Sequence, residues 1–387
     1  MQPTVVITRR GEDRARGGHP WIYRSDIAEV RASRGDTVQV VGPHGRPVGQ
    51  ALFSDRSEIA LRFLTHGDEP ADLALWDRRL RAAVAFRESL HIDASAYRLV
   101  HGEADLLPSL IVDRYGSVLV VQALSQGVDR LLPQITSLLK EILQPSGILA
   151  RNDPRVRLLE GLERKIEVLH GEVPEAIVVR EGSIEYDVDP WKGQKTGLFL
   201  DQRENHEAAS VYARGRALDC FTYQGGFALR LASKADDVMA VDISDDALGR
   251  VGRNAHRNHL ANVRTVSGNV FDVLRELERA SERFDAIVLD PPAFAKNRAA
   301  LSRALAGYKE INLRALKLLV PDGYLITCSC SYHVDESRLG QVLHEAATDA
   351  RVSITVVEKR MQSRDHPVLL AAPETHYLKC FIARKIV

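Results

Sequence analysis

The sequence predicts an α/β protein: a C-terminal Rossmann-like sheet that follows an N-terminal β-rich domain and a central α+β domain. Two observations predict this class. From Leu198 onward, apolar runs of strand length alternate with helical patterns, which requires crossover connections and a mainly parallel sheet. Before that point the patterns are mixed, with short strands first and helices afterwards. We place the domains at residues 1–68, 73–185 and 186–387.

The first domain is expected to consist of short strands. β-rich runs at residues 5–8, 37–41 and 60–64 are separated by glycine turns, and no long helix is expected among them. The polar segment 66–70 indicates a linker. The central domain is expected to hold an amphipathic helix over 75–89, a hairpin over 109–122, a helix over 128–143, and strands near 147–150 and 175–188.

In the C-terminal domain, several expected strands end on polar residues. Residues 216–227 are typical of a strand, a glycine turn and a helix start, and the next strand ends at Asp242. Further on, one strand stops at Asp290, before two prolines, and another, over 323–331, presents a thiol. Ligands of an open α/β sheet lie outside the carboxyl ends of its strands, so these groups are expected to face one crevice.

The glycine turn lacks the G-x-G-x-x-G spacing of dinucleotide-binding folds, so a nicotinamide cofactor is disfavoured. Its two adjacent glycines allow close backbone approach to a ligand, although the turn alone is equally typical of an ordinary strand-to-helix connection. Asp242 is placed to accept hydrogen bonds from the ribose of an adenosine group, because Ser244 or Asp245 can cap the following helix instead.

Composition limits the setting. The chain has 387 residues, 52 of them basic and 52 acidic, so no overall field attracts nucleic acid, and RNA contact requires a local patch. The four cysteines have neither zinc-ligand spacing nor the density of a disulfide scaffold, and no uncharged stretch of about 18 residues is present. We expect a soluble cytoplasmic protein without a metal site or a membrane span.

Ordered motifs occur along nearly the whole chain, at residues 18–23, 99–108, 193–203, 220–227, 290–294, 329–331, 365–368 and 377–379. Together they resemble the RlmI-type family, bacterial S-adenosylmethionine-dependent 5-cytosine methyltransferases of large-subunit (23S) rRNA. The first motif is similar to that family's PUA domain and the second to its central domain. The others are similar to its class I methyltransferase domain.

The resemblance implies S-adenosylmethionine as cofactor and large-subunit rRNA, naked or in an assembling particle, as partner. It also implies roles by position. Asn269 stands where relatives usually carry the acid that reaches the adenine amine, and its amide oxygen can accept the same hydrogen bond. For Asp201, a helix N-cap is the alternative to a cofactor contact. The implied cofactor-binding residues are Gln194, Thr196, Asp201, Arg203, Asp219, Phe221, Gly225, Asp242, Asn269 and Asp290.

The resemblance further implies a cysteine nucleophile, and spacing favours Cys330. RNA 5-cytosine methyltransferases typically place this cysteine seven residues beyond a glycine, and counting from Gly323 reaches Cys330. Acids five or six residues later are also typical, and Asp335 and Glu336 stand there. Cys328 lies nearer the strand interior and is expected to pack as a small apolar residue.

A thiolate is needed because cytosine C5 is a poor nucleophile. Addition of Cys330 to C6 makes C5 reactive towards a methyl donor, which divides one difficult step into two. Asp290 is expected to hydrogen-bond the N3 and N4 edge of the base, where charge develops. The base that later removes the C5 proton is not identified from the sequence.

The RNA contact is expected at the N-terminal domain, where the first 35 residues hold more arginines than acids. The target base must be unstacked, and Phe294 or Tyr332 could stack on it, although core packing is the more usual role of either ring. Oligomeric state is left open, with a homodimer as one option. The arginines are Arg9, Arg10, Arg14, Arg16, Arg24, Arg31 and Arg34.

Two other functions stay open at this point. An exocyclic-amine methyltransferase would use the motif at residues 290–292, but Ala293 spoils the usual spacing to Phe294. A non-catalytic RNA-binding assembly factor would have no need of Cys330, of the acid at position 290 or of the paired glycines.

Overall fold

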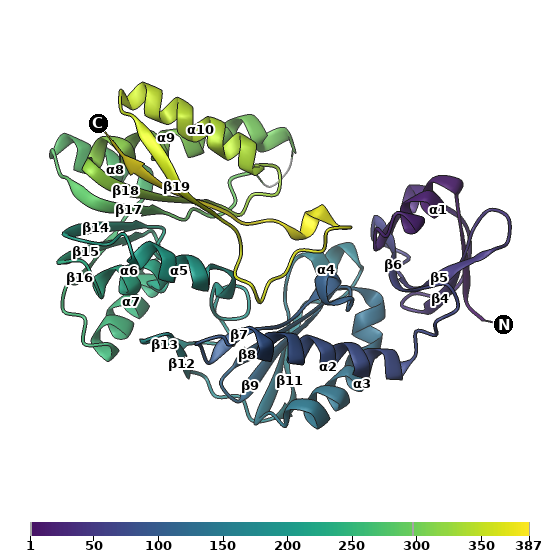
Figure 1. Cartoon of the computed structure of the whole chain (residues 1–387). Helices are drawn as coiled ribbons and strands as arrows, with labels where there is room; N and C mark the ends of the chain where they lie inside the picture. Colours follow the sequence, from purple (N-terminus) through teal and green to yellow (C-terminus); the bar gives the residue numbers. More distant parts are fainter. Residues whose placement is uncertain (1, 296–297, 387) are drawn as a thin grey trace. The chain divides into compact units, whose positions relative to one another are not determined.

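The computed structural model describes residues 2–295 and 298–386 of the chain. They fall into two compact units, unit 1 and unit 2, that are interleaved along the sequence (Figure 1). Unit 1 comprises Met1–Val179, Val188–Leu198 and Arg364–Thr375, and unit 2 comprises Arg180–Asp187, Phe199–Ser363 and His376–Val387. The three-domain division expected from the sequence stays a finer prediction, since its first two domains share unit 1.

The N-terminal part of unit 1 contains β1 (Thr4–Ile7), α1 (Arg9–Arg16), β2 (Trp21–Tyr23), β3 (Ile27–Arg31), β4 (Thr37–Val41), β5 (Pro47–Phe53) and β6 (Ile59–His66). The strands form one sheet in the order β2-β6-β5-β4-β1-β3. Alternate residues such as Val38 and Val40 are fully buried, and this period of two is what makes the segment fold as strands.

Helix α1 is a short element that the sequence did not predict. The Thr8 hydroxyl accepts a hydrogen bond from the Gly11 amide at 3.2 Å and caps its start. Only Gly11 and Ala15 of this helix are buried, and the other six residues are charged. Because the helix has almost no apolar face, its sequence carries no helical periodicity to detect.

The second part of unit 1 contains α2 (Leu73–Ser89), β7 (Ala96–His101), β8 (Leu110–Tyr115), β9 (Val118–Ala123), α3 (Gln126–Leu143), β10 (Gly147–Asn152), α4 (Val156–Leu159) and β11 (Lys165–Gly171). The sheet order is β11-β10-β9-β8-β7. The expected helices and hairpin are confirmed, whereas β7 and β11 were not predicted. A separate two-stranded sheet pairs β12 (Ile177–Glu181) with β13 (Ile184–Val188).

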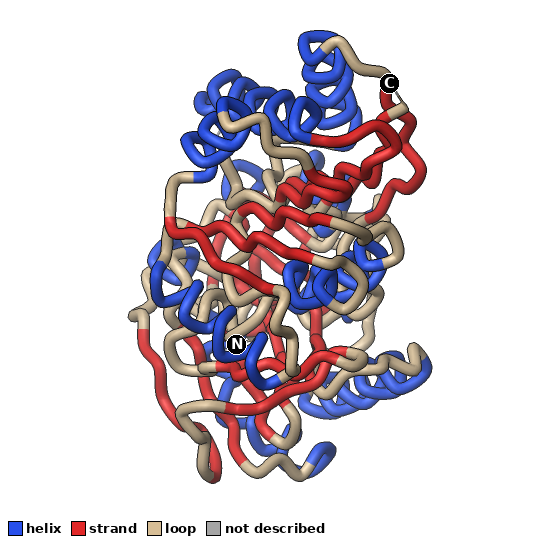
Figure 2. Tube along the Cα trace, turned by 90° about the vertical axis from the view of Figure 1, so that its left-hand side faces the viewer, coloured by secondary structure: helices blue, strands red, loops and turns tan. Residues whose placement is uncertain are grey.

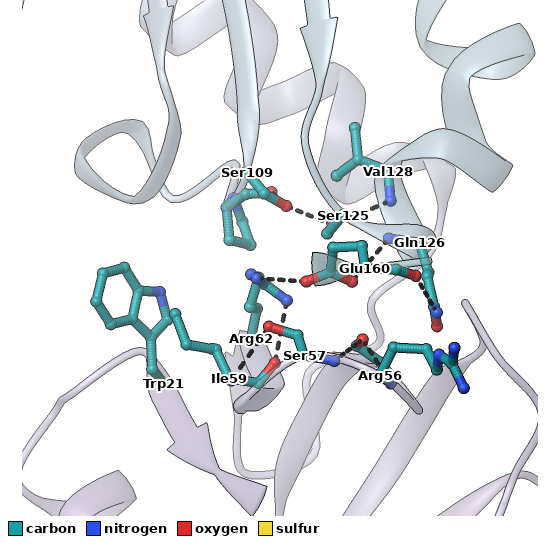
Figure 3. A network of polar contacts seen from close by, with 12 residues as sticks. Trp21, Arg56, Ser57, Ile59, Arg62, Ser109, Ser125, Gln126, Val128 and Glu160 are labelled. Carbon is teal, nitrogen blue, oxygen red and sulfur yellow. Dashed lines mark hydrogen bonds and ion pairs between the residues drawn. The ribbon is translucent and has the colours of Figure 1, made fainter. Parts of the chain in front are cut away.

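The two parts of unit 1 share buried contacts (Figure 3). Leu52 and Leu64 of the N-terminal sheet belong to the same apolar cluster as residues of α2 and α3. Beside them, Arg62 Nη2 lies 2.8 Å from Glu160 Oε1, and both side chains are almost fully buried. Gln126 Nε2 donates to the Glu160 carbonyl oxygen at 2.6 Å in the same network. The N-terminal sheet therefore packs as an integral part of unit 1.

Two segments from later in the sequence also belong to unit 1 and are held by buried polar contacts. The Arg98 amide donates to Asp365 Oδ2 at 2.8 Å, and Thr196 Oγ1 donates to Asp113 Oδ2 at 2.6 Å. Arg98 and Asp113 form an ion pair at 2.8 Å. The motifs around Thr196 and Asp365 therefore have a structural role in unit 1.

Unit 2 contains α5 (Arg203–Ser210), β14 (Arg216–Cys220), α6 (Gly226–Ala232), β15 (Asp237–Asp242), α7 (Asp245–Arg257), β16 (Val263–Ser267), α8 (Val270–Arg279), β17 (Phe284–Leu289), α9 (Leu301–Leu318), β18 (Leu319–Ser329), α10 (Glu336–Ala350), β19 (Ile354–Arg360) and β20 (Lys379–Lys385). Its sheet has the order β16-β15-β14-β17-β18-β20-β19. Strand β20 is antiparallel to both of its neighbours, and the other neighbouring pairs are parallel.

Helices cover both faces of this sheet (Figures 1 and 2). Helices α8, α9 and α10 lie over one face, which includes Ile287 and Leu325. Helices α5, α6 and α7 lie over the other, which includes Ala286 and Ile326. Successive strand residues therefore enter opposite apolar layers, which is why these strands are continuous apolar runs in the sequence. The predicted Rossmann-like fold is confirmed.

Two features are not found in the part of the chain that the structure describes. None of its helices combines the length and the apolar character of a membrane span. Its histidine, cysteine and acidic side chains form no group of three or more that could hold a metal ion.

Candidate active site

The polar residues predicted at strand ends lie along one edge of the unit 2 sheet. Strands β14, β17 and β18 are neighbours, with Cys220 paired to Leu289 and Leu289 paired to Thr327. Asp290 and Cys330 therefore follow the carboxyl ends of adjacent strands. The strand order reverses between β14 and β17, and ligands of open α/β sheets bind at such a switch point.

The turn between β14 and α6 has a backbone conformation that ordinary residues avoid. Phe221 and Tyr223 have φ angles of 64° and 51°, in the left-handed region, and Gly225 follows at 88°. Strained residues of this kind cluster at ligand sites. The Tyr223 amide donates to Asp242 Oδ2 at 2.9 Å, so the end of β15 supports this conformation.

The two adjacent glycines of the turn serve different purposes. Gly225 supplies a left-handed φ angle. A Cβ atom at Gly226 would lie 2.6 Å from the His206 ring, so this glycine makes room for a neighbouring side chain. His206 Nδ1 in turn lies 3.0 Å from Glu181 Oε1. The space beside Gly226 is thus filled by protein.

Asp242 ends β15 with its carboxylate in contact with backbone. Oδ2 accepts from Tyr223, and Oδ1 accepts from the Ser244 amide at 3.0 Å. Each carboxylate oxygen has a second lone pair, so these contacts orient Asp242 without using its whole acceptor capacity. The Ser244 hydroxyl caps α7 as predicted, accepting from the Ala247 amide at 3.3 Å. Ile243 is 71% exposed and leaves an apolar surface beside the turn.

Asp219 is a buried carboxyl group near the carboxyl end of β14. Its Oδ2 accepts from Thr222 Oγ1 at 2.6 Å and from the Ala228 amide at 2.9 Å. Its Oδ1 has no hydrogen-bond partner among the described residues. Burial raises the pKa of Asp219 to about 7, although the two hydrogen bonds act in the opposite direction. A buried acceptor without a partner, beside a strained turn, is available to a hydrogen-bond donor of a ligand.

Asn269 and Asp201 have partners within unit 2. The Asn269 side chain accepts from the Phe271 amide at 2.9 Å and caps α8. Asp201 Oδ2 accepts from the Tyr377 hydroxyl at 2.7 Å, and the N-cap of α5 is Gln202 rather than Asp201. These contacts fix both side chains in place, and their roles towards a cofactor remain predictions.

The remaining residues assigned by family position are divided between the units. Arg203 is buried in unit 2, with its guanidinium 3.7 Å from the Glu204 carboxylate. Gln194 and Thr196 lie in unit 1, where the Thr196 hydroxyl also lies 2.9 Å from the Tyr115 hydroxyl. A cofactor contact of Gln194 or Thr196 stays a prediction.

The two thiols at residues 328 and 330 differ in environment. Cys328 lies within β18, opposite Cys380 of β20, and has no exposed surface. Burial above all, and then the contact with Cys380, raises the pKa of the Cys328 thiol well above its usual value. Cys330 follows the strand end and is partly exposed. The packing expected for Cys328 is confirmed, and solvent reaches Cys330.

Hydrogen bonds hold the residues on either side of Cys330 in place. Ser329 Oγ donates to the Tyr308 hydroxyl at 3.0 Å, and the same hydroxyl lies 2.9 Å from Ser331 Oγ. From β20, Lys379 Nζ donates to the Ser331 carbonyl oxygen at 2.8 Å. The turn that carries Cys330 is therefore held from α9 and from β20 while its thiol stays accessible.

Sequence reasoning assigned no role to Tyr308 or Lys379. Tyr308 lies on the apolar face of α9 and is typical of a core residue. Lys379 starts β20, where a lysine is usually solvated, yet it is 3% exposed. The usable signal is a polar atom on an otherwise apolar face, because a buried hydroxyl or ammonium needs partners.

Asp290 and the two candidate stacking rings occupy different environments. Asp290 is partly exposed just beyond β17. Phe294 packs against the ring of Tyr308 at 4.7 Å between centroids and lies at the margin of the apolar core. Tyr332, two residues after Cys330, is 58% exposed. Phe294 therefore packs at the core, as is usual for such a ring. Of the two candidate rings, only Tyr332 is largely exposed, and stacking on a base stays a prediction for it.

Comparisons with known proteins identify the family to which the chain belongs. A PUA-like domain family matches residues 5–66, and the S-adenosylmethionine-dependent methyltransferase family matches residues 98–379. Ribosomal RNA large subunit methyltransferase I of Tolumonas auensis is 39% identical over 397 residues, with 100% of both chains covered. The protein of the same name from Aeromonas salmonicida is 39% identical over 394 residues, covering 99% of this chain and 100% of its own.

Solved structures agree in fold. SMU.776 complexed with SAH has a TM-score of 0.86 at 20% identity and covers 98% of this chain and 99% of its own. A SAM-dependent methyltransferase from Agrobacterium tumefaciens has a TM-score of 0.53 at 17% identity, with 76% and 90% covered. Since the family match spans most of the chain and the relatives align along its whole length, this protein belongs to the S-adenosylmethionine-dependent methyltransferases, in the PUA-containing family of Ribosomal RNA large subunit methyltransferase I.

Proposed function

We propose that this protein transfers a methyl group from S-adenosylmethionine to C5 of a cytosine in large-subunit rRNA, through a covalent adduct of Cys330. The names of the relatives support the rRNA substrate class. The choice of C5 rests on one observation: Cys330 is a partly exposed thiol on an anchored turn, at the sheet edge that also carries the strained glycine turn. Methylation of an exocyclic amine needs no such thiol.

Residues of unit 2 around the glycine turn would hold the cofactor. Asp242 would accept hydrogen bonds from the ribose hydroxyls, and Asp219 Oδ1 would accept from the amine of the amino-acid part. When bound, S-adenosylmethionine supplies a methyl group made electrophilic by its sulfonium. By family position the same role falls to Asp201, Arg203, Phe221, Gly225, Asn269 and Asp290 of unit 2, and to Gln194 and Thr196 of unit 1.

The protein's own groups carry the covalent steps. The Cys330 thiolate forms a bond to C6, which moves electron density towards N3 and makes C5 nucleophilic. Asp290, in its protonated form, would donate a hydrogen bond to N3, accept one from the N4 amine, and so stabilise that density. Once C5 has taken the methyl group, a base removes the C5 proton, the bond between sulfur and C6 breaks, and the thiolate is restored.

The N-terminal sheet would supply part of the RNA contact, and its arginines differ in the partners that they already have. Arg24 donates to the backbone carbonyl oxygens of Ser54 and Ser57. Arg9 and Arg34 are exposed and are the stronger candidates for phosphate contact. Three other arginines lie in ion pairs, which are Arg10 with Asp26, Arg16 with Glu12, and Arg31 with Glu29.

Large-subunit rRNA transcribed with 5-fluorocytidine in place of cytidine tests the covalent step. Fluorine cannot leave C5 as a cation where a proton would, so the methylated adduct cannot break down. A complex that survives denaturation should form in the presence of S-adenosylmethionine. Cys328→Ala, the matched control, should form it as the unaltered protein does, whereas Cys330→Ala should not.

Each alternative to the proposed function predicts a different experimental result. An adduct that maps to Cys328 would show that the wrong thiol has been chosen. A product methylated on an exocyclic nitrogen would overturn the reaction class. A folded protein that fails to bind S-adenosylmethionine in calorimetry would support the non-catalytic assembly factor.

A further inference from the structure

Lys379 is a buried cation next to the proposed nucleophile. It pairs with Ser329 in the register of β18 and β20, so it enters the sheet beside the strand end that leads to Cys330. Its Nζ donates to the carbonyl oxygens of Ser331 at 2.8 Å and Tyr377 at 2.9 Å. The ammonium therefore joins the residue after Cys330 to the start of β20.

The charge on Lys379 is maintained against burial by nearby negative groups. Burial lowers the pKa of Lys379 to about 8, while attraction to the Cys330 thiolate and to Asp335 acts in the opposite direction. Near pH 7 the ammonium form therefore predominates. Attraction between two charges is mutual, so a field that favours the ammonium of Lys379 also favours the thiolate of Cys330.

Three other described groups that belong to elements around this turn are neutral or acidic. Tyr308 of α9, whose hydroxyl holds both flanking serines, is neutral, and burial raises its pKa further. Asp335, at the start of α10, is an acid and opposes a thiolate. Asp290, from the end of β17, is also an acid. Lys379 is a cation that can offset these acids at Cys330.

We propose that Lys379 is a positioning residue that stabilises the thiolate of Cys330 and fixes the turn that carries it. The catalytic meaning of this inference rests on the proposed function, because only a thiolate adds to C6. The electrostatic claim itself concerns the free protein and needs neither RNA nor cofactor to be tested.

The same strand provides a matched control. Lys385, at the other end of β20, is also largely buried, and its Nζ donates to the carbonyl oxygens of Leu316 at 3.1 Å and Leu319 at 2.7 Å. Burial likewise lowers its pKa. Lys385 thus shares the strand and the two carbonyl contacts of Lys379, but no interaction with Cys330.

The test is the rate at which iodoacetamide alkylates Cys330 in the full chain from pH 6 to pH 10, read by peptide mass spectrometry. Lys379→Gln keeps an amide that can donate to the two carbonyls and removes the charge. We expect its profile to shift to higher pH, with alkylation slowed about tenfold near pH 7, the effect of a displacement by one pH unit. Lys385→Gln should match the unaltered protein.

Three buried thiols report whether each variant is folded. Cys220, Cys328 and Cys380 have no exposed surface, so their alkylation marks unfolding. If they stay protected and the Cys330 profile of Lys379→Gln equals that of Lys385→Gln, the proposal is wrong. If Lys379→Gln unfolds, Lys379→Arg is measured in its place. This variant retains the positive charge, so the pH profile of Cys330 alkylation must stay unshifted. A shifted profile overturns the proposal.

The outcome is independent of the reaction assigned to the protein. If Lys379→Gln shifts the alkylation profile but 5-fluorocytidine RNA traps no adduct, the charge coupling holds and the methylation chemistry is wrong. If RNA is trapped normally while the alkylation profile does not move, Cys330 is the nucleophile and gains nothing from Lys379.

Discussion

Buried charged side chains of unit 1 are arranged differently from those at the carboxyl edge of the unit 2 sheet. In unit 1, ion pairs join residues of different elements, which are Arg62 with Glu160, Arg87 with Asp105, and Arg98 with Asp113. At the carboxyl edge of the unit 2 sheet, Asp219 and Lys379 are equally buried, but their hydrogen bonds go to backbone groups and a hydroxyl.

This difference separates charges that are paired within the fold from ionisable groups placed at the candidate site. A buried ion pair satisfies both of its members, so it needs nothing from outside. A buried ionisable group that forms no ion pair has a pKa shifted by burial, to about 7 for Asp219 and about 8 for Lys379. Such shifts are concentrated at functional sites, and here both lie where a parallel sheet binds its ligands.

Among changes at the carboxyl edge of the unit 2 sheet, loss of the Cys330 thiol should have the largest effect on methylation activity. We expect Cys330→Ala to lower methylation of large-subunit rRNA by on the order of 10³-fold or more, as loss of a covalent nucleophile does in other enzymes. Incorporation of labelled methyl groups measures this. Calorimetry should show unchanged cofactor affinity, since the thiol serves the base. Cys328→Ala should keep most of the activity, and equal losses in both variants would contradict the assignment.

Removal of one member of a buried ion pair tests the structural half of the comparison. Glu160→Ala leaves Arg62 buried without its partner, which typically costs about 3 to 5 kcal/mol of unfolding free energy. Urea unfolding followed by fluorescence measures the change. The control is Glu141→Ala, which removes an exposed partner of Arg81 and should cost less than about 1 kcal/mol. Similar values for the two variants would show that burial does not distinguish the pairs.

The sequence predicts the parts of this arrangement that are local in the chain. The apolar strands, the glycine turn, the Ser244 cap and the spacing that selects Cys330 all follow from residues a few positions apart. Contacts such as Arg62 with Glu160 join residues 98 positions apart and carry no local signal. Tyr308 and Lys379 were missed for the same reason, because only the folded sheet brings α9 and β20 to the turn of Cys330.

Replacement of Asp242 should have a moderate effect on the affinity for S-adenosylmethionine. Asp242→Ala removes the proposed acceptor for the ribose hydroxyls and also releases the amides of Tyr223 and Ser244. We expect a loss of about 1.5 to 3 kcal/mol, roughly tenfold to a hundredfold in affinity for S-adenosylmethionine. Calorimetry with Asp246→Ala, an exposed acid of α7, as control measures this. Unchanged affinity in folded Asp242→Ala would remove Asp242 from the site.

The pH dependence of the free energy of unfolding should reveal the raised pKa of Asp219. The folded pKa of Asp219, about 7, lies above the value of about 4 for an unfolded aspartate, so the folded state binds more protons between these values. Stability contributed by Asp219 is therefore lost as pH rises through that window, by at most about 1.4 kcal/mol for each pH unit.

Asp219→Asn should remove this part of the pH dependence. The difference in unfolding free energy between the unaltered protein and the variant should fall from pH 4 to pH 7 and stay constant above. A constant difference over the whole range would mean that Asp219 is ionised in the folded protein.

Proton release on cofactor binding provides a second test of Asp219. If Asp219 is protonated until a cationic amine reaches Oδ1, binding of S-adenosylmethionine at pH 6 must expel that proton. Calorimetry in two buffers of different ionisation enthalpy would detect the release, and Asp219→Asn would abolish it. A proton released on binding would join the pKa shift to the cofactor and identify Asp219 as a charge kept for a ligand.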